Sequence, residues 1–376
     1  MRSIYIKSCF LALLASTFLC SCKKDKGPSV DDTLLSYEIQ NVPATRDFPV
    51  GAFYLNTGAF NTSIVDVPVV GKYNFTNGVP VPASPSDPAI MPQHIDFALK
   101  AKIDYFIFSV RSVTFDNSGY NADSLLIKSF LDVPASANMK FAVSYTLDIS
   151  KFGVSNTVAL ETRPQATIDG FYNDFKRLAT FFGKSNYMKT GGKCILVINS
   201  AQNLNAINSP AVYAEIRKRL SALGFELFIV GMQDKWSPPQ RFYYRFQNCV
   251  DAMYEANMID AGDSPDKVYL FHQMVNENWK YWKQMLDSWN IEFIPSIAPG
   301  RIYTYENATS KNLPLKRSES FFRKFCSVAK MNASKSGLIF IDSFNEFRKD
   351  TQIEPAQSYG NLYLDITRQE FKLNQN

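Results

Sequence analysis

Histidine is almost absent from this chain of 376 residues, which has only His94 and His272. A histidine-rich metal site is therefore excluded, and a serine–histidine–aspartate triad would have to use one of these two rings. Cysteine is also scarce, and after Cys22 only Cys194, Cys249 and Cys326 remain, all in apolar surroundings. We expect buried thiols there rather than a disulfide framework. No metal and no cofactor is expected.

A strongly basic surface is missing as well. The net charge of +5 falls to +3, with 38 basic against 35 acidic residues, once Arg2 and Lys7 are left out. The remaining Lys and Arg residues are dispersed, so we do not expect nucleic acid as a partner. No glycine-rich turn follows an early strand-like run, which argues against a nucleotide-binding sheet.

The first residues have the pattern of an export signal. A positive start is followed by the apolar run Cys9–Leu19, which is too short to span a bilayer. Small residues then precede Cys22, an arrangement that resembles the lipobox of bacterial lipoproteins, in which this cysteine is acylated and becomes the first residue of the mature protein. We therefore predict a signal peptide over residues 1–21 and lipidation at Cys22. An ordinary secretory signal cut nearby is the alternative.

The residues after Cys22 divide into a tether and a domain. Residues 22–47 are largely polar and begin with charges and Gly-Pro, which is typical of a flexible tether. No later apolar run approaches ~18 residues, so we expect membrane contact only through the lipid anchor. The predicted location is the cell envelope, on the periplasmic or the outer face of the outer membrane. Residues 48–376 are predicted to form a single, monomeric domain.

Short apolar runs alternate with amphipathic stretches in this domain. Each run is rich in β-branched or aromatic residues and nearly continuous in apolar character, as expected of strands buried on both faces. There are eight of them: Val50–Asn56, Tyr105–Arg111, Lys140–Asp148, Lys193–Ser200, Glu226–Gln233, Val250–Asn257, Glu292–Gly300 and Leu338–Phe347. Helix-sized connections separate them, which predicts an α/β fold, a (β/α)8 TIM-type barrel. An open doubly wound sheet is the alternative.

Three connections carry clear helical signals. Apolar residues repeat at three- and four-residue intervals over 168–182, 212–223 and 321–328. Ser209 before Pro210 is expected to cap the second helix, and Ser318 is expected to open the third. The long connection Thr57–Asp104 is rich in Pro and Gly, and we expect it to fold over the barrel mouth as an irregular loop or a hairpin.

Polar side chains end or follow most of the apolar runs. In this architecture catalytic groups lie at the carboxyl ends of the strands, and burying such groups unpaired would cost ~1–3 kcal/mol each. The candidates for substrate binding are Asn56, Tyr145, Asp148, Gln233, Tyr254, Glu255, Arg301, Tyr303 and Asn345, with Glu346 as a catalytic candidate. A ring of carboxylates, amides, Tyr and Arg suits a polyol, and two carboxylates are the usual requirement for glycoside hydrolysis.

One segment carries a recognisable signature. Residues Ser343–Tyr359 (SFNEFRKDTQIEPAQSY) resemble the SFNEW-xx-GTQIEP motif of glycoside hydrolase family 99, the endo-α-mannosidase type, and of the related WbsX-like proteins. Other stretches agree in order, so that the similarity covers about residues 48–366: Val50–Asn56, Pro92–Arg111, Asn186–Ile198, Val250–Asn257 and Ile294–Arg301. The resemblance implies a (β/α)8 fold and an oligosaccharide or polysaccharide, an α-mannan or a related glycan, as partner.

Transfer of the family's catalytic residues meets a departure. Family enzymes act with retention through two glutamates in NEWHEG, the first activating the sugar's own 2-hydroxyl and the second serving as acid/base. Glu346 occupies the first position, but the second is Lys349, whose ammonium ordinarily titrates near ~10.4 and has no carboxyl to shuttle a proton. Asp350, the next residue, is our candidate for the missing acid.

Three hypotheses follow from the sequence. The first is a glycosidase with Glu346 as its key carboxylate, and the second is a catalytically impaired relative that binds glycan, because Lys349 stands at the acid/base position. The third is a structural lipoprotein without a ligand. We favour the first.

Overall fold

Parallel strands and helices alternate along the chain. The computed structural model describes residues 37–56, 64–234 and 236–373, and from Ile39 onward they belong to one compact unit. The parallel strands of the central sheet, in chain order, are β1 (Val50–Tyr54), β4 (Tyr105–Val110), β5 (Lys140–Thr146), β7 (Lys193–Asn199), β8 (Leu227–Gln233), β9 (Ala252–Glu255), β10 (Glu292–Ile294), β11 (Ser296–Ile297) and β12 (Ile339–Ile341). Each lies within one of the eight predicted runs, so the strand predictions are confirmed.

The central sheet closes on itself. Neighbouring strands follow the order β10-β9-β8-β7-β5-β4-β1-β12-β11, and every pairing along this path is parallel. β10 and β11 are two parts of one strand position, interrupted at Pro295, whose nitrogen has no hydrogen to donate to a ladder. The Pro295 carbonyl still accepts a hydrogen bond of 2.9 Å from the Phe340 nitrogen of β12. The predicted (β/α)8 barrel is therefore confirmed, and the open sheet is not what forms.

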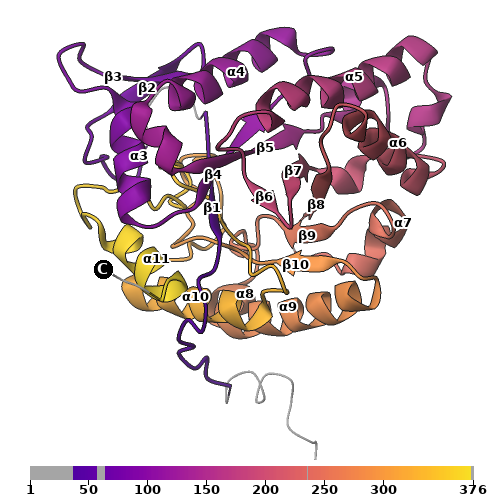
Figure 1. Cartoon of the computed structure of the whole chain (residues 1–376). Helices are drawn as coiled ribbons and strands as arrows, with labels where there is room; N and C mark the ends of the chain where they lie inside the picture. Colours follow the sequence, from indigo (N-terminus) through magenta and orange to yellow (C-terminus); the bar gives the residue numbers. More distant parts are fainter. Residues whose placement is uncertain (1–36, 57–63, 235, 374–376) are drawn as a thin grey trace, which may run out of the picture. The chain divides into compact units, whose positions relative to one another are not determined.

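Helices cover the outside of this barrel (Figure 1). Their bounds are α3 (Ile90–Lys100), α4 (Asn117–Leu131), α5 (Gln165–Phe182), α6 (Ser209–Ser221), α7 (Tyr243–Phe246), α8 (Pro265–Tyr269), α9 (Phe271–Ser288), α10 (Glu319–Asn332) and α11 (Leu362–Phe371). The three predicted helical stripes correspond to α5, α6 and α10. Ser318 caps α10 as predicted, its side chain accepting from the Phe321 nitrogen. The cap of α6 is Asn208 rather than Ser209, because its amide oxygen accepts from the Ala211 nitrogen.

The connection between β1 and β4 contains more order than an irregular loop. β2 (Tyr73–Thr76) and β3 (Val79–Pro82) form an antiparallel hairpin, and α3 follows it. Tyr73 of the hairpin is fully buried against Phe347 and Ala356, residues of the segment that follows β12. The hairpin therefore packs on the last loop of the barrel, as the sequence led us to expect.

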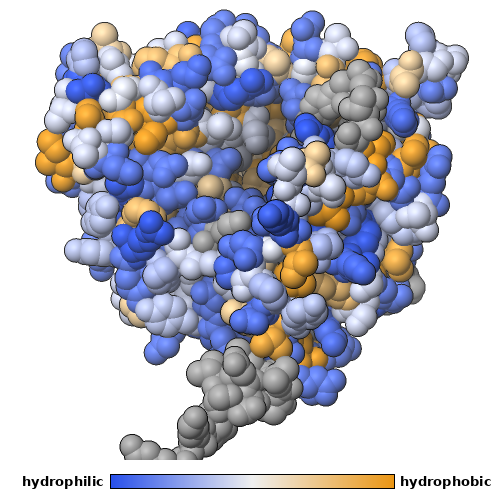
Figure 2. Space-filling model, turned by 180° about the vertical axis from the view of Figure 1, so that it is seen from behind, coloured by the Kyte–Doolittle hydropathy of each residue, from blue (hydrophilic) through white to orange (hydrophobic). Residues whose placement is uncertain are grey.

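The cysteines of the domain are buried, and polar side chains cover much of its surface. Cys194, Cys249 and Cys326 are free and buried, as predicted. In the space-filling view, hydrophilic side chains spread over the face opposite that of Figure 1, with apolar ones scattered between them (Figure 2). Among the helices of the described residues, none has the length and apolar character needed to cross a membrane. The predicted signal peptide and Cys22 lie outside the described residues.

Candidate functional site

Aromatic side chains fill the barrel just below its carboxyl end. The ring of Phe340, in β12, lies 5.5 Å from that of Phe53 in β1 and 5.2 Å from that of Tyr254 in β9, measured between centroids. Since β1 and β9 are not neighbours in the sheet, these contacts cross the barrel interior. Side chains two residues apart in a strand share one face, so Asp342 continues the inward face of Phe340. The Asp342 nitrogen still donates to the Ile297 carbonyl of β11, at 2.9 Å, which keeps it in the ladder.

Glu346 lies in the loop after β12, at the carboxyl end of the barrel. The residue is only 5% exposed, and one oxygen, Oε1, accepts a hydrogen bond of 3.0 Å from the Arg348 nitrogen. Its own nitrogen donates to Ser343 Oγ. Burial raises the pKa of Glu346 above its ordinary value and the charge of Asp342 adds to this, while the Arg348 N–H, Lys349 and Arg348 act in the opposite direction. Among the described residues, no lysine or arginine side chain forms an ion pair with Glu346.

Positive charges stand on one side of these two carboxyls. Arg301 is paired with Asp260 and Glu306, each at 2.5 Å, and Lys349 lies 3.4 Å from Glu306. Burial raises the pKa of Asp342, while Lys349 and Arg301 lower it. Lys349 is thus an ammonium close to both Asp342 and Glu346 that is itself paired with a third acid. Its side chain keeps 38% of its surface exposed.

Asp350 faces a different partner. Its carboxylate forms an ion pair of 2.6 Å with Arg317 Nε, and Arg317 also donates to the carbonyls of Asp350 and Gln352. Arg317 thereby fixes the backbone of the loop through several contacts. The catalytic role predicted for Asp350 stays a prediction, and the ion pair gives this carboxylate a structural task.

A buried chain of hydrogen bonds supports the loop that carries Glu346. The Tyr54 hydroxyl is hydrogen-bonded to His94 Nδ1 (2.8 Å), His94 Nε2 lies 3.0 Å from Glu354 Oε1, and the Tyr73 hydroxyl donates to Glu354 Oε2 (2.8 Å). All four side chains are fully buried. Glu354 therefore holds the loop through side chains of β1, α3 and the hairpin.

Four of the predicted binding residues make structural contacts instead. Tyr145 donates to Asp174 of α5 at 2.6 Å, and Glu255 accepts from Asn278 of α9 at 2.7 Å, so both point outward to the helices. Gln233 donates to the carbonyls of Ser237 and Pro238, holding the turn after β8. Asn345 exchanges two hydrogen bonds with the backbone of Leu55, one in each direction.

The other predicted residues lie at or near the mouth. Tyr254 faces the barrel interior, and burial together with the nearby Asp342 raises its pKa. Tyr303 accepts a hydrogen bond from the Gly262 nitrogen and packs beneath Arg301, which keeps this pair of residues at the rim. Asn56 is exposed just after β1. Asp148 is exposed as well, but its carboxylate accepts from Ser150 and so caps a local turn.

Asp342 is the residue that the sequence reasoning missed. We took polar residues only where the apolar runs ended, and Asp342 stands inside the run Leu338–Phe347. A usable signal was present, because a single acid follows the strand Ile339–Ile341 in phase with Phe340. An acid on the inward face of a barrel strand needs a ligand, a partner or a proton.

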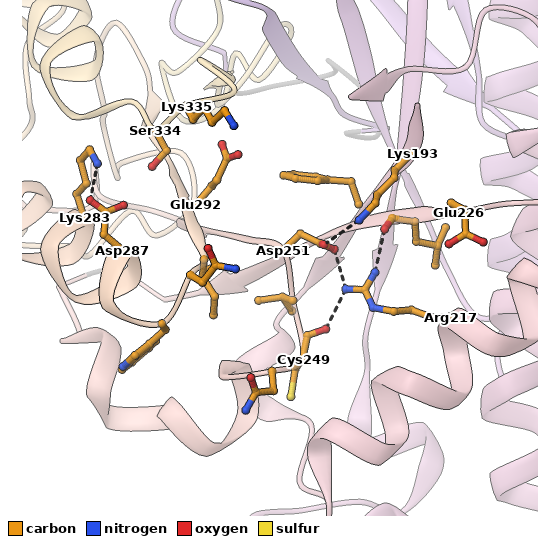
Figure 3. A pocket seen from close by; sticks show the side chains of 17 residues that line it. Lys193, Arg217, Glu226, Cys249, Asp251, Lys283, Asp287, Glu292, Ser334 and Lys335 are labelled. Carbon is orange, nitrogen blue, oxygen red and sulfur yellow. Dashed lines mark hydrogen bonds and ion pairs between the residues drawn. The ribbon is translucent and has the colours of Figure 1, made fainter. Parts of the chain in front are cut away.

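A second, charged hollow lies at the opposite end of the barrel. It encloses about 730 Å³ beside the amino ends of β7, β8 and β10, and its side chains come from the strands and the helices around them (Figure 3). Arg217 lies 2.7 Å from Asp251, with Lys193 3.7 Å from the same carboxylate, and Lys283 is paired with Asp287 at 2.6 Å. Active sites of such barrels lie at the carboxyl end, so we assign this hollow to stability. Within the described ranges, no group of three or more His, Cys, Asp or Glu could hold a metal ion.

Comparison with known proteins gives the family. Residues 160–367, more than half of the chain, match the family described as "Glycosyltransferase WbsX". The chain belongs to this family. The matched stretch begins ahead of β7 and includes Glu346, Lys349 and Asp350. The WbsX family is one of the two that the SFNEF…TQIEP segment resembles, so that recognition is confirmed.

Sequence relatives and solved structures agree with the assignment. The chain is 32% identical over 93 residues to the human glycoprotein endo-alpha-1,2-mannosidase-like protein, a stretch that covers 24% of this chain and only 20% of the human protein. A structure described as "Glycoside hydrolase-like protein" has a TM-score of 0.80 and 28% identity, covering 92% of this chain and 99% of its own. A GH99 endo-alpha-mannosidase from Bacteroides thetaiotaomicron has a TM-score of 0.58 at 19% identity, covering 87% and 97%, which shows a shared fold.

Proposed function

We propose that this protein is a glycoside hydrolase that acts on an α-mannan or a related glycan, with Glu346 as its key carboxylate. The observation that carries the proposal is the place of Glu346 in the loop after the last barrel strand, nearly buried and without an ion pair among the described residues. A carboxylate in such surroundings has its strongest interactions with whatever enters the mouth. The descriptions of the similar proteins support the same class of reaction and substrate.

The chemistry asked of Glu346 follows from its hydrogen bonds. The N–H of Arg348 favours the ionised carboxylate, and the ammonium of Lys349 lies nearby. An ionised carboxylate stabilises the positive charge that develops at the anomeric carbon, or takes a proton from a neighbouring sugar hydroxyl, as the resemblance to retaining enzymes implies. The aromatic rings of Phe53, Tyr254 and Phe340 pack against one another across the barrel interior.

A glycan-binding protein without turnover is the second candidate. The observation that favours it is Lys349, which stands where the family has its acid/base and is paired with Glu306. A lysine at that place binds sugar hydroxyls or an anionic substituent but does not protonate a leaving group near neutral pH.

One experiment separates the two candidates. The purified protein is incubated with yeast α-mannan and with α-1,2-, α-1,3- and α-1,6-mannobiose, and new reducing ends are measured beside binding by calorimetry. We expect turnover by the wild type and a loss of at least ~10³-fold in Glu346→Gln, which keeps the hydrogen-bond acceptor for Arg348. Glu277→Gln on the exposed face of α9 is the matched control and should change nothing. Binding without reducing ends favours the second candidate, and full activity of Glu346→Gln removes that residue from the mechanism.

The product pattern also tests the family's description as a transferase. Cleavage and transfer share the departure of the first sugar and differ in whether water or another hydroxyl attacks. Mass spectrometry of the mannobiose reaction should show mannose alone for hydrolysis, whereas trisaccharides would indicate transfer.

We further propose that the protein is anchored to the cell envelope through Cys22. The support is the lipobox-like sequence before that residue. Metabolic labelling with an alkyne fatty acid should mark the wild type, and Cys22→Ala should be unlabelled and should leave the membrane fraction. Labelling of Cys22→Ala would contradict the proposal.

A further inference from the structure

The mouth contains a second carboxyl that the family pattern does not provide. Lys349 occupies the acid/base position, and Asp350 is held by Arg317, so neither offers a free carboxyl beside Glu346. Asp342 does. It continues the ladder of β12 into the mouth, on the same inward face as Phe340.

Asp342 differs from most other inward or buried acids in having no fixed partner. Glu354, Glu255, Asp174 and Asp123 each accept hydrogen bonds from neighbouring side chains. The carboxylate of Asp342 accepts none from the residues that the structure describes, and the residue is only partly buried. A carboxyl left open at the end of a barrel strand is positioned to contact a ligand.

The residues around Asp342 are those of the mouth itself. Its charge acts on Tyr254 of β9 and on Glu346, and it is in turn affected by Lys349, Arg301 and Asp260. Asp342 and Glu346 are four residues apart and joined through the turn in which Ser343 Oγ accepts from the Glu346 nitrogen. The two carboxyls thus belong to one turn, and the charge of Asp342 acts on Glu346.

We infer that Asp342 is the second catalytic carboxyl of this site and donates the proton to the glycosidic oxygen, while Glu346 remains ionised. The inference rests on the proposed hydrolase function. The roles follow from the hydrogen bonds: Glu346 accepts an N–H that stabilises its negative charge, and Asp342 accepts none, so of the two Asp342 keeps its proton more readily. Two neighbouring carboxyls in one low-dielectric site share one proton in this way.

The reaction is balanced with these two residues and water. The proton of Asp342 moves to the glycosidic oxygen as the bond from that oxygen to the anomeric carbon breaks, and the bonding electrons stay on the oxygen. Glu346 stabilises the positive charge at the anomeric carbon. Water then forms the new bond to that carbon and returns a proton to Asp342, so that one water is consumed and two hydroxyl-bearing sugars leave.

The test exploits the leaving group. A proton donor is needed for a sugar leaving group and hardly at all for 2,4-dinitrophenolate, which departs as an anion. We compare the wild type, Asp342→Asn, Asp342→Glu and Glu346→Gln on α-mannobiose and on 2,4-dinitrophenyl α-mannobioside. Asp342→Asn should lose at least ~100-fold on the disaccharide and less than ~10-fold on the aryl glycoside, and it should lose the alkaline limb of the pH profile. Glu346→Gln should lose both substrates.

Control variants distinguish a failure of the role proposed for Asp342 from a failure of the hydrolase proposal. Asp365→Asn, an exposed acid on α11, should behave as the wild type, and thermal melting checks that each variant folds. If Asp342→Asn does not fold, Asp342→Glu, which keeps an acid displaced by one methylene, should be slowed on the disaccharide and spared on the aryl glycoside. Equal losses on both substrates, or full activity on the disaccharide, overturn the role of Asp342 and leave the hydrolase proposal intact. A wild type that cleaves neither substrate overturns both.

Discussion

The two ends of the barrel differ in the partners of some of their carboxylates. At the amino end, Arg217 and Lys193 converge on Asp251, and Lys283 is paired with Asp287, so these five charges each have a neighbour of opposite sign (Figure 3). At the carboxyl end, Asp342 and Glu346 are left without ion pairs among the described residues. An ion pair offsets the cost of burying its charges. A buried carboxyl without a partner raises the free energy of the folded state, which is typical of a residue that contacts a ligand. The difference supports the proposal that ligands bind at the carboxyl end.

Removing Glu354 should produce the largest loss of stability. Glu354→Ala leaves His94 and the Tyr73 hydroxyl buried without their acceptor, which should cost ~3–5 kcal/mol in the free energy of unfolding. Because the loop with Glu346 rests on this chain of bonds, turnover should fall too. Urea unfolding and reducing-end assays measure both, with Glu319→Ala on the exposed start of α10 as the control. Unchanged stability would mean that the mouth is supported in another way.

Asp251→Asn should affect the amino end alone. Asp251 accepts hydrogen bonds from Arg217 (2.7 Å) and from the Ile229 nitrogen (2.8 Å). Weakening them should lower the free energy of unfolding by ~1–3 kcal/mol while kcat/KM stays within about twofold. Asp287→Asn, an exposed pair in the same hollow, should cost less than ~1 kcal/mol. A strong loss of kcat/KM in Asp251→Asn would break the division between the two ends.

Mild acid should weaken the outer wall near the carboxyl end. His272, in the first turn of α9, has a pKa lowered from 6.5 to about 4 by burial, with Lys324 adding to the effect. The folded state therefore holds the neutral ring while the unfolded chain takes up a proton. This stability is fully present above pH 6.5 and is lost as the pH falls toward 4, by up to ~2–3 kcal/mol. Unfolding free energies at pH 7 and 4.5 should show a smaller difference in His272→Phe, and an equal difference would exclude this residue as the cause.

Lys349→Met should have the smallest effect and the most specific one. Lys349 lowers the pKa of both Glu346 and Asp342. Its removal should raise both, so the whole pH profile of kcat/KM should move to higher pH by ~0.5–1, with little change in stability. Lys311→Met, on an exposed part of a nearby loop, is the control. A shift toward lower pH would contradict the placement of this ammonium.

The fold could be predicted from the sequence because its strands are buried on both faces. Runs such as KCILVIN of β7 are continuous in apolar character, and each emerged as a barrel strand. Because both faces of a strand are apolar, the sequence does not show whether a side chain points into the barrel or toward the helices. Tyr145 and Glu255 stand at strand ends and were assigned to the mouth, but they point to α5 and α9. Only the register with neighbouring strands decides this.

The site could be predicted in part for a related reason. Glu346 was found from its motif and its place after the last strand. Asp342 was missed because it stands inside the apolar run Leu338–Phe347, and its inward face is recognised only from the ring contacts of Phe340, two residues earlier. In the network of Tyr54, Tyr73, His94 and Glu354, the single hydrogen bond from Tyr73 to Glu354 joins residues 281 positions apart, and no local sequence pattern indicates such a contact.

The double hydrogen bond between Asn345 and Leu55 has a consequence for biogenesis. These residues are 290 positions apart, and they fasten the first strand of the barrel to the turn after the last one. A nascent chain cannot assemble the mouth until almost all of it has emerged from the ribosome or the export channel. A protein cut short before residue 345 would carry most of the barrel and none of its chemistry.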